Sequence, residues 1–593
     1  MTILSASFVN LFNLSDTAIL ELARAAGVEI VQFGDRTFVY VAAIDDDGIA
    51  VFEMLPDGTL TALPDVEDSV ALELDGAFRM TSCEISGTYF LIVAGQFDDG
   101  ISVFSVDPVT GALANTDNIS DAGGLELDGA SAVSAVTVAG NTFVVVAGYN
   151  DNGLSIFGLD ANGTLIPVQN ISDIGTLELD GAYYVTDAMV DGVQLILVSG
   201  YADNGISVFS MEATGQLTPL FDLADDPSLQ LAQPSDLEVV QIGGVTYLYV
   251  ASQGEDAVSV FSVAASGQLT LLDTVTGPSL NGVHGLRTID VDGLTLLAAA
   301  AQHTGTVTLF SVQPSGRLVE IAQVGDDATL NLLGTLSGDF VQTGDGLFYV
   351  ASGFLDSGIS VFEIAGGNDA LVGDDGDNQL LGLGGDDTLT GLGGDDLLSG
   401  GGGGDLLSGG RGRNDLRGGT GVDTASYEEA NGVRADLETG TAVARGYAND
   451  SLAEIENLTG SLRSDVLLGD NGDNRLRGLD GRDQLFGRNG NDEINGGSGA
   501  DVLSGGAGDD LLTGGAGRDI FQFADTFGND VVTDFAPRFE RLDLRLVTAA
   551  NSFADLTITQ TGLDTLISLA GVDDTILLLN VEADDLQIND FWF

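Results

Sequence analysis

The sequence predicts an all-β protein in which a seven-bladed β-propeller, residues 1–363, precedes a long region rich in glycine and aspartate. Two observations carry this prediction. A unit of about 52 residues, made of short apolar runs separated by Asp-Gly and Asn-Gly turns, occurs seven times. After the last unit, a nine-residue phrase repeats in strict register in two blocks, at 364–426 and 460–522.

Each of the seven units carries one phenylalanine and one leucine at matching places. Four apolar runs bounded by turn signals predict four antiparallel strands in each unit. Four strands repeated seven times indicate a β-propeller. The phenylalanines are Phe52, Phe104, Phe157, Phe209, Phe261, Phe310 and Phe362, and the leucines are Leu20, Leu72, Leu125, Leu177, Leu229, Leu280 and Leu330.

The seventh unit runs into the glycine-rich region without the outer strand that the other units have. The segment SFVNLFNLSD, residues 7–16, matches the outer strands TPLFDLADD (218–226) and LIPVQNISD (165–173). We therefore expect the N-terminal strand 7–16 to complete the last blade. Closing the ring in this way removes edges that would otherwise pair with other chains.

Phrases such as SVFSVDPVTGALA, residues 102–114, resemble the seven-bladed lactonase-type propellers of the 6-phosphogluconolactonase-like family. The resemblance covers about residues 1–363 and implies the fold first, because propellers carry many unrelated functions. It also introduces lactone hydrolysis as one activity to weigh.

The nonapeptides follow the frame G-G-x-G-x-D-x-U-x, where U is a large apolar residue. Glycines let the backbone turn tightly, the aspartate supplies a hard anionic oxygen, and the U residue fills a narrow core. Oxygen ligands without His or Cys suit calcium rather than zinc. A flexible spacer is the alternative for this composition, but strict register through fourteen units argues against it.

This frame resembles the RTX family of haemolysin-type calcium-binding repeats, which implies a parallel β-roll. In that family the sixth-position aspartates of turns on the same side clamp each ion, so each block of seven offers at most five sites. Asn378, Asn414 and Asn474 lack the charge, and their sites should be weaker or absent. The segment 427–459 resembles the linker between such blocks. The expected calcium ligands are Asp369, Asp387, Asp396, Asp405, Asp423, Asp465, Asp483, Asp492, Asp501, Asp510 and Asp519.

We expect several calcium ions that hold the roll together rather than catalyse a reaction. Extracellular calcium modules bind at about 10⁻⁴–10⁻³ M, so the roll should fill outside the cell, where metal binding becomes folding free energy. Residues 523–593, which end in DLQINDFWF, resemble the β-rich C-terminal cap and type I secretion signal of serralysin-like proteins. The N-terminal residues show no basic region or small-residue cleavage site. The sequence therefore predicts a secreted protein, released or retained on the cell surface, with the type I secretion machinery as a partner.

Composition excludes two classes of partner. The formal net charge is −71, from 90 acidic residues against 19 basic residues, all of them arginine. Such a surface repels phosphate backbones and anionic lipids, which argues against nucleic-acid binding and electrostatic membrane docking. No run of 18 apolar residues occurs, so we expect no transmembrane segment.

The propeller alone holds 48 acidic residues and five arginines, a net charge of −43. Its turns between the second and third strands are acidic and should share one face with the leucine segments. Asp-x-Gly is ordinary hairpin chemistry, and the alternative is a ring of acids that gathers calcium or a cationic partner. These acids are Asp45–Asp47, Asp98, Asp99, Asp151, Asp203, Glu255, Asp256 and Asp356.

Blade six departs from the other six, because it carries the only two histidines of the chain, His284 and His303, with Arg287 close by. We expect both histidines on one face with Arg287, where this His-Arg cluster could serve as general base and anion clamp for lactone or ester hydrolysis. Incidental histidines in drifted loops are the alternative. VHGLR (283–287) resembles the Gly-Pro-Arg-His element of lactonase-type propellers, with a different order and spacing.

Taken together, these patterns favour a secreted calcium-binding RTX protein. Its propeller would be an extracellular binding, adhesion or matrix module for a glycan or surface ligand. The alternative is an extracellular lactonase or esterase that uses the blade-six residues.

Overall fold

The computed structural model describes residues 2–4, 6–17, 20, 22–34, 36–69, 72–121, 124–175, 177–226, 228–291, 293–327, 329–343, 346–445, 449–569 and 571–593. The chain forms two compact units. One is Ala6–Ala365, and the other is Gly366–Phe593 together with the N-terminal strand β1 (Thr2–Leu4). The predicted all-β fold, a seven-bladed propeller followed by a parallel β-solenoid, is confirmed.

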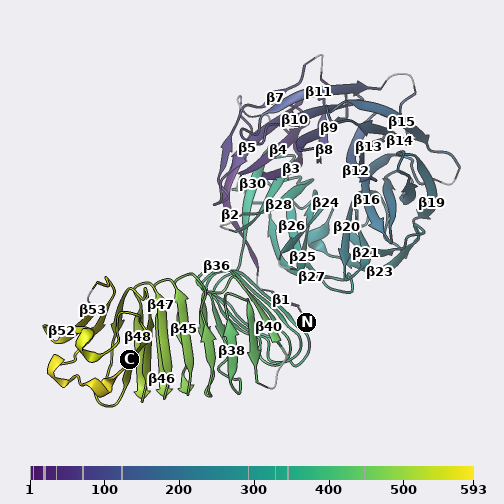
Figure 1. The fold of residues 1–593 in the computed structure, drawn as a ribbon. Coiled ribbons are helices and arrows are strands. Elements are labelled where there is room, and N and C mark those ends of the chain that lie inside the picture. Colours follow the sequence, from purple (N-terminus) through teal and green to yellow (C-terminus); the bar gives the residue numbers. More distant parts are fainter. Residues whose placement is uncertain are drawn as a thin grey trace. The chain divides into compact units, whose positions relative to one another are not determined.

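The first unit is a ring of seven antiparallel sheets around a central axis (Figure 1). From the innermost strand outward, the blades are β3 (Ala25–Phe33), β4 (Arg36–Ala43), β5 (Gly48–Met54), β6 (Leu60–Ala62) and β7 (Val66–Glu67); β8 (Ala77–Ile85), β9 (Thr88–Gly95), β10 (Gly100–Val106) and β11 (Leu113–Ser120); β12 (Ala130–Val138), β13 (Asn141–Gly148), β14 (Gly153–Leu159) and β15 (Leu165–Ser172); β16 (Ala182–Val190), β17 (Val193–Gly200), β18 (Gly205–Met211) and β19 (Leu217–Ala224); β20 (Pro234–Ile242), β21 (Val245–Ser252), β22 (Ala257–Val263) and β23 (Leu269–Thr276); β24 (Val283–Val291), β25 (Leu294–Ala301), β26 (Thr306–Val312) and β27 (Leu318–Gly325); and β28 (Gly338–Gln342), β29 (Leu347–Gly353), β30 (Gly358–Ala365) and β2 (Ser7–Ser15).

The ring is closed both at its innermost strands and at its outermost strands. The innermost strands contact one another in circular order, and β28 of the seventh blade contacts β3 of the first. At the outside, β2 pairs antiparallel with β30, with Phe12 opposite Val361 and Leu14 opposite Ile359. Phe12 and Leu14 pack against the core between blades seven and one. The N-terminal strand therefore shares its blade with strands more than 300 residues away in the sequence.

The repeated apolar residues form the contacts between neighbouring blades. The seven repeat phenylalanines, from Phe52 to Phe362, are at most 1% exposed. In blades two to six, the pairing of the third and fourth strands shifts at that phenylalanine, for example between Val208 and Phe209. Each blade thus buries the same large ring, which explains why the spacing of these residues predicted the blade count.

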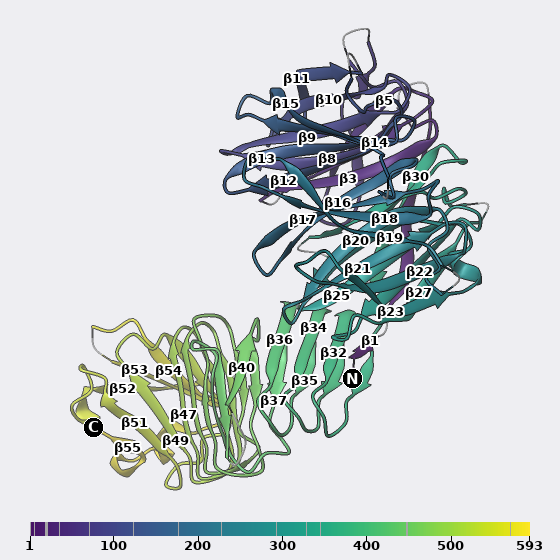
Figure 2. The same cartoon turned by 90° about the vertical axis from the view of Figure 1, so that its right-hand side faces the viewer.

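The second unit is a solenoid of about 10 turns, built from two sheets of short parallel strands. Strands pair with those eighteen residues further along, so Leu397 lies opposite Asp415 and Thr388 opposite Leu406. Figure 2 shows β32, β34 and β36 as successive rungs. One sheet runs through β1, β32 (Gln379–Gly384), β34 (Leu397–Gly403), β36 (Asp415–Gly421), β40 (Asn449–Ala453), β39 (Thr441–Ala444), β38 (Val433–Asp436), β42 (Val466–Leu468), β45 (Gln484–Asn489), β47 (Val502–Ala507), β49 (Ile520–Ala524), β51 (Arg541–Leu546) and β55 (Phe591–Trp592).

The facing sheet has the same eighteen-residue rhythm, and the U residues of both sheets form one core, of which Leu389, Leu398 and Leu407 are fully buried. Its strands are β31 (Ala370–Val372), β33 (Thr388–Thr390), β35 (Leu406–Ser408), β37 (Thr424–Ser426), β41 (Asn457–Thr459), β43 (Arg475–Arg477), β44 (Asp480–Gly481), β46 (Glu493–Gly499), β48 (Leu511–Gly517), β50 (Asn529–Val532), β54 (Thr575–Leu578), β53 (Asp564–Leu569) and β52 (Leu556–Thr561). Short 3-10 turns lie at Pro278–Leu280, Phe553–Asp555, Ala583–Asp585 and Ile588–Asp590.

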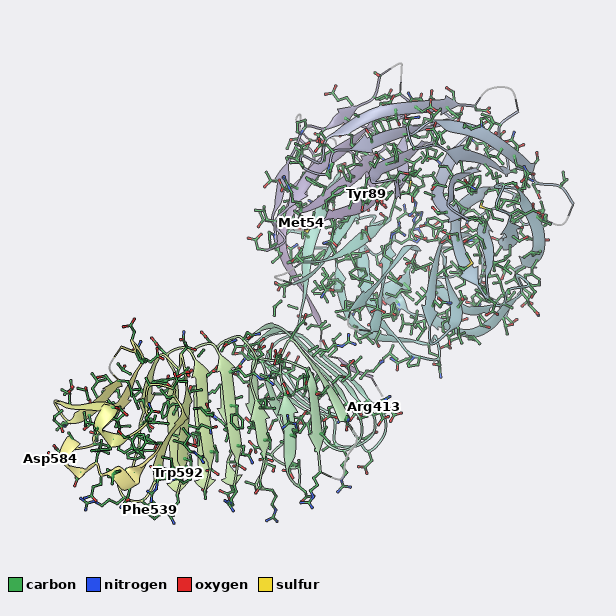
Figure 3. All side chains as sticks on the ribbon, viewed as in Figure 1. Met54, Tyr89, Arg413, Phe539, Asp584 and Trp592 are labelled. Carbon is green, nitrogen blue, oxygen red and sulfur yellow. The ribbon has the colours of Figure 1, made fainter. Side chains whose placement is uncertain are left out.

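The segment between the two nonapeptide blocks is part of the solenoid. β40 pairs parallel with β36, and β38 pairs parallel with β42. β39 lies between β40 and β38 and is antiparallel to both. The two blocks therefore share one continuous sheet. At the far end, the cap strands β51 and β55 extend the same sheet, and the guanidinium of Arg545 lies over the ring of Trp592, which Figure 3 labels.

We predict that β2 holds the propeller ring closed. A chain lacking residues 1–16 should lose the burial of Phe12 and Leu14, worth ~3 kcal/mol, and the thermal midpoint of the propeller should fall by ~5 °C or more. Circular dichroism with calcium present measures this midpoint. A chain lacking only residues 1–5 is the matched control, because it removes β1 and keeps β2. Equal propeller midpoints for the two truncated chains would contradict the prediction.

Candidate functional site

The axis of the propeller is lined by the first residues of the innermost strands. In blades one to six, the pairing of the first two strands shifts near the start of the innermost strand, which leaves one bulged residue unpaired. Bulges re-aim side chains and are frequent next to binding sites. The bulged residues are Ala26, Phe78, Ser131, Tyr183, Ser235 and His284.

A pocket of about 290 Å³ lies over three of these bulged residues, Phe78, Tyr183 and His284. The rest of its lining comes mainly from residues that directly follow the second strands of several blades. These are Ile44, Gln96, Phe97, Tyr201, Gln253, Gln302 and Phe354, joined by Arg24 and Leu336. The pocket therefore combines aromatic walls with a rim of amide side chains, and it opens on the face that carries the acidic turns.

Tyr183 is the centre of the aromatic wall. Its ring makes edge contacts with Phe78, Tyr149 and His284, at centroid distances of 6.1, 6.0 and 5.7 Å, and a tilted contact with Tyr201 at 5.0 Å. The rim is held by a chain of hydrogen bonds. The Tyr201 hydroxyl donates to Gln253 Oε1 at 2.6 Å, and Gln253 Nε2 donates to Gln302 Oε1 at 2.6 Å.

His284 lines the pocket and is only 3% exposed. Its Nδ1 lies 3.2 Å from the carbonyl of Leu336 and 3.4 Å from Nη2 of Arg79, and its Nε2 lies 2.9 Å from the Tyr183 hydroxyl. Burial, together with the Arg79 guanidinium, lowers the pKa of His284 to about 3. The imidazole is therefore neutral and engaged at both nitrogens.

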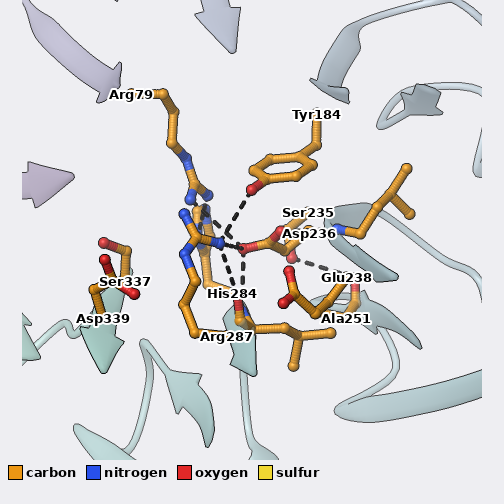
Figure 4. Close-up of polar contacts among 12 residues, drawn as sticks. Arg79, Tyr184, Ser235, Asp236, Glu238, Ala251, His284, Arg287, Ser337 and Asp339 are labelled. Carbon is orange, nitrogen blue, oxygen red and sulfur yellow. Dashed lines mark hydrogen bonds and ion pairs between the residues drawn. The ribbon is translucent and has the colours of Figure 1, made fainter. Parts of the chain in front are cut away.

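A charge cluster lies beside His284 (Figure 4). The carboxylate of Asp236 is fully buried and lies 3.5 Å from the guanidinium of Arg79 and 3.8 Å from that of Arg287. Arg287 also donates to the Tyr184 hydroxyl at 3.1 Å. Burial raises the pKa of Glu238 to about 7. Two guanidinium groups, of buried Arg79 and partly buried Arg287, thus share the Asp236 carboxylate next to the pocket.

The structure brings His284 and Arg287 into one polar cluster with Arg79 and Asp236, and it places His303 outside that cluster. His284 lines the pocket, and Arg287 lies in the charge cluster. His303 is exposed, bonds Asn281 Oδ1 through Nδ1 at 3.1 Å, and is not part of the pocket lining. Sequence reasoning missed Arg79, Tyr184 and Asp236. The sequence did carry a signal for two of them. In the aligned repeats, Arg79 and Asp236 directly follow the bulged residue, and the equivalent position in blade six is Gly285.

The acidic turns have a clear structural role. In six blades, an acid of the turn accepts the backbone N–H of the leucine segment of its own blade, as Asp98 does from Asp75 at 2.9 Å. The last residue of the turn reaches the next blade, as Asp99 does to Gly129 N–H at 2.9 Å. Blade six has Thr304 and Gly305 at these places. These hydrogen bonds indicate that the acids stabilise the hairpins and loops rather than form a ring of free carboxylates.

In the solenoid, the sixth-position aspartates form a second candidate site. One carboxylate oxygen accepts the backbone N–H of the residue eighteen positions earlier, as Asp492 Oδ1 does from Asn474 at 2.8 Å. The other oxygen is buried without a hydrogen-bond partner. Burial raises the pKa of Asp492 to about 7. The orphaned oxygens are Oδ2 of Asp369, Asp387, Asp396, Asp405, Asp423, Asp483, Asp492, Asp501, Asp510, Asp519 and Asp530.

Glycine keeps this side of the ladder open. A Cβ at Gly478 would lie 2.6 Å from Asp483 Oδ2 and 2.5 Å from the Gly496 carbonyl, so a side chain there would fill a space lined by oxygens. Asp465 differs from the other aspartates, because Ser461 donates to its Oδ2 through the backbone N–H at 2.6 Å. Asn378 and Asn474 accept from Asp374 and Asp470 within their own turns. These positions therefore satisfy their side chains within the protein.

The ladder extends beyond the two predicted blocks. Asp450 and Glu456, in the segment between them, accept the backbone N–H groups of Asn414 and Asp423, each at 2.8 Å. Asp530 continues it after the second block by accepting from Asp510 at 3.0 Å. The nine-residue frame did not find these acids because the chain reaches them over intervals other than eighteen residues.

Comparisons with protein families agree with both resemblances seen in the sequence. The RTX calcium-binding nonapeptide repeat matches four times, at 365–398, 390–425, 459–494 and 486–521. The seven-bladed beta-propeller Lactonase family matches residues 194–328. No curated protein matches the chain.

Several solved structures are similar at low identity. A protein from Lactobacillus plantarum is 18% identical, with a TM-score of 0.38 over 51% of this chain and 88% of its own. The periplasmic gluconolactonase of Pseudomonas aeruginosa is 16% identical, with a TM-score of 0.39 over 51% and 87%. An extracellular lipase of Serratia marcescens is 22% identical, with a TM-score of 0.20 over 39% and 40%. This chain therefore joins a Lactonase-family seven-bladed propeller domain to RTX calcium-binding nonapeptide repeats.

Proposed function

We propose that this is a secreted, calcium-loaded binding protein. The RTX solenoid takes up several calcium ions, and the axial pocket of the propeller holds an extracellular glycan or a similar surface ligand. The observation that carries the binding function is the pocket itself, in which aromatic side chains lie beside His284, whose two ring nitrogens are already engaged.

Calcium fits the solenoid on the chemistry of its donor set. The orphaned carboxylate oxygens recur every eighteen residues beside glycine carbonyls, and calcium prefers such oxygen ligands at 2.3–2.6 Å. Within the described parts of the chain, no three acidic or imidazole side chains gather as a metal site by themselves. Each ion would therefore draw on backbone carbonyls as well as on carboxylates. The bound ion would neutralise buried charge and stabilise the folded turns.

A single Asp→Asn substitution tests this assignment. In Asp492→Asn, the amide oxygen can still accept the N–H of Asn474, but the orphaned anionic oxygen is lost. We expect fewer bound calcium ions by titration calorimetry and a calcium midpoint for folding raised by ~10-fold. Asp473→Asn is the matched control, because Asp473 is exposed and only accepts the N–H of Asn491. The same loss in both variants, or in neither, would refute the role of Asp492.

Glycan binding by the propeller follows from the chemistry of the pocket. Gln96, Gln253 and Gln302 offer amide donors and acceptors at the rim, while Tyr201 and Phe97 offer ring faces. Few well-placed polar groups among aromatic walls are typical of small-molecule sites. The net charge of −43 on residues 1–363 disfavours an anionic ligand at this mouth.

Hydrolysis of a lactone or ester is the second candidate, and the place of His284 in the pocket lining favours it. The pKa of about 3 weakens His284 as a base, because a group this acidic in its protonated form holds a proton poorly at neutral pH. Both of its nitrogens are also engaged. Binding therefore accounts for more of the pocket than proton transfer does.

One experiment separates the two functions. Calcium-refolded protein is screened on a glycan array and against lactones and esters, beside Gln253→Ala and the control Gln241→Ala, whose exposed glutamine lies outside the pocket. We expect Gln253→Ala to weaken glycan binding by ~10-fold, because it removes hydrogen bonds at the rim, and Gln241→Ala to have no effect. Turnover that is lost in His284→Ala and kept in His303→Ala would establish the hydrolase instead.

Secretion rests on the RTX repeats and on the C-terminal cap. Among the residues that the structure describes, no helix is long and apolar enough to span a bilayer. We predict that residues 523–593 carry the export signal for a type I system. A chain lacking them should stay in the cells of a host that expresses such a system, while the full chain reaches the medium, as immunoblotting would show. Equal amounts of both chains in the medium would refute this role. Because export precedes folding, a folding defect of the shortened chain would not by itself keep it in the cells.

A further inference from the structure

A cluster of three arginines surrounds an open pocket in the middle of the solenoid. The pocket has a volume of about 570 Å³ and is lined by Arg434, Arg445 and Arg463 together with Gly432, Val443 and Ser464. These residues come from the inserted strands β38 and β39 and from the loop before β42. The three guanidinium-bearing residues are exposed, and the pocket lies wholly within the solenoid. We call it the arginine pocket.

Backbone geometry gathers these arginines around Gly432. The carbonyl of Gly432 accepts the N–H of Arg445 at 2.7 Å, and a Cβ at Gly432 would lie 3.9 Å from Cβ of Arg463. Arg434 follows two residues later on β38, where Val433 and Ala435 are buried, so alternation places Arg434 on the outer face. Arg434 is paired in register with Val443, which is exposed on the same face.

None of the three guanidinium groups makes an ion pair or a side-chain hydrogen bond with the part of the chain that the structure describes. The neighbouring acids are engaged elsewhere. Asp465 accepts the N–H of Val433 at 2.7 Å, and Asp436 is bound by Arg488 at 2.8 Å. In a chain with 90 acidic residues and only 19 arginines, three unpaired arginines around one pocket are unexpected. Their charge is left for a ligand from outside.

A fourth arginine extends the positive field. The backbone N–H of Arg482, one coil further along, donates to the Ser464 hydroxyl at 3.2 Å, which places this exposed residue beside the pocket. The net charge of −71 acts only weakly at the pocket, because solvent ions screen exposed charges that lie more than about 8 Å away at physiological salt. Within the pocket, the nearby guanidinium groups dominate.

We propose that the arginine pocket binds a sulfate or phosphate ester carried by a sugar. Guanidinium groups pair with such oxyanions through parallel N–H donors, and three of them suit a tetrahedral group with three free oxygens better than a two-oxygen carboxylate. The volume equals that of roughly twenty waters at ~30 Å³ each, which leaves space for the sugar beside the anion. This site is separate from the axial pocket and goes beyond the proposed function, because it adds recognition of an anionic glycan.

The test uses full-length, calcium-loaded protein and isothermal titration calorimetry with glucose 6-sulfate. We expect saturable binding that weakens with added salt and falls by ~10-fold in Arg434→Gln and in Arg463→Gln. Arg475→Gln is the matched control, because Arg475 is also an exposed solenoid arginine but is paired with Glu493 at 2.8 Å. Its affinity for the probe should be unchanged. Circular dichroism in calcium confirms that each variant is folded.

Three further probes distinguish the ligand chemistries. Inorganic sulfate reports on the free ion, glucuronate on a carboxylate, and glucose on the sugar alone. Binding of glucose 6-sulfate that exceeds all three supports the proposal. Absence of binding, or binding that is equal in the Arg434→Gln/Arg445→Gln/Arg463→Gln triple variant, would overturn it. Self-association that the triple variant loses, without any binding of the sulfate ester, would also overturn it and assign the pocket to an acidic surface of a second copy.

A glycan-array result leaves the two sites distinguishable. Gln253→Ala should weaken glycan binding by the propeller and leave the binding of glucose 6-sulfate unchanged. The arginine variants should weaken the binding of glucose 6-sulfate and leave glycan binding by the axial pocket unchanged. The two proposals can therefore fail independently.

Discussion

A carboxylate oxygen that accepts a backbone N–H group is the interaction on which both halves of this protein depend. In the propeller it fastens a turn to its own leucine segment, as Asp98 does, or to the next blade, as Asp99 does. In the solenoid it fastens one coil to the next, as Asp492 does. Each contact needs an acid at a repeated position, so much of the charge of −71 serves the architecture.

The two halves differ in what happens to the second carboxylate oxygen. In the propeller turns the acids are partly exposed, and water can solvate that oxygen. In the solenoid it is buried without a partner, as at Asp501 and Asp510, where a bare charge is costly. The solenoid therefore depends on a cation in a way that the propeller does not. Calcium outside the cell would supply it, which links the folding of one half to its location.

Arginine is scarce, and its placement separates structure from recognition. Arg79, which is buried, and Arg287, which is partly buried, both pair with Asp236 next to the axial pocket. Arg434 and Arg463 are exposed and make no ion pair with the described residues. In the functions proposed above, the paired set lies next to a site for a neutral ligand, and the unpaired set offers its charge directly to an anionic one. A protein with both could hold a glycan through its sugar rings and through its anionic substituents.

The sequence by itself determined the blade count, the strand that closes the ring and the ladder aspartates within the two nonapeptide blocks, because each follows a period that packing demands. The phenylalanine at each 52-residue step and the aspartate at each ninth residue are such cases. Only the tertiary structure decided that Arg79, Tyr184 and Asp236 meet on the axis, and that β38, β39 and β40 enter the sheet beside an arginine pocket. These residues depart from the repeats, and ring closure and coil stacking bring them together across separations that no local pattern records.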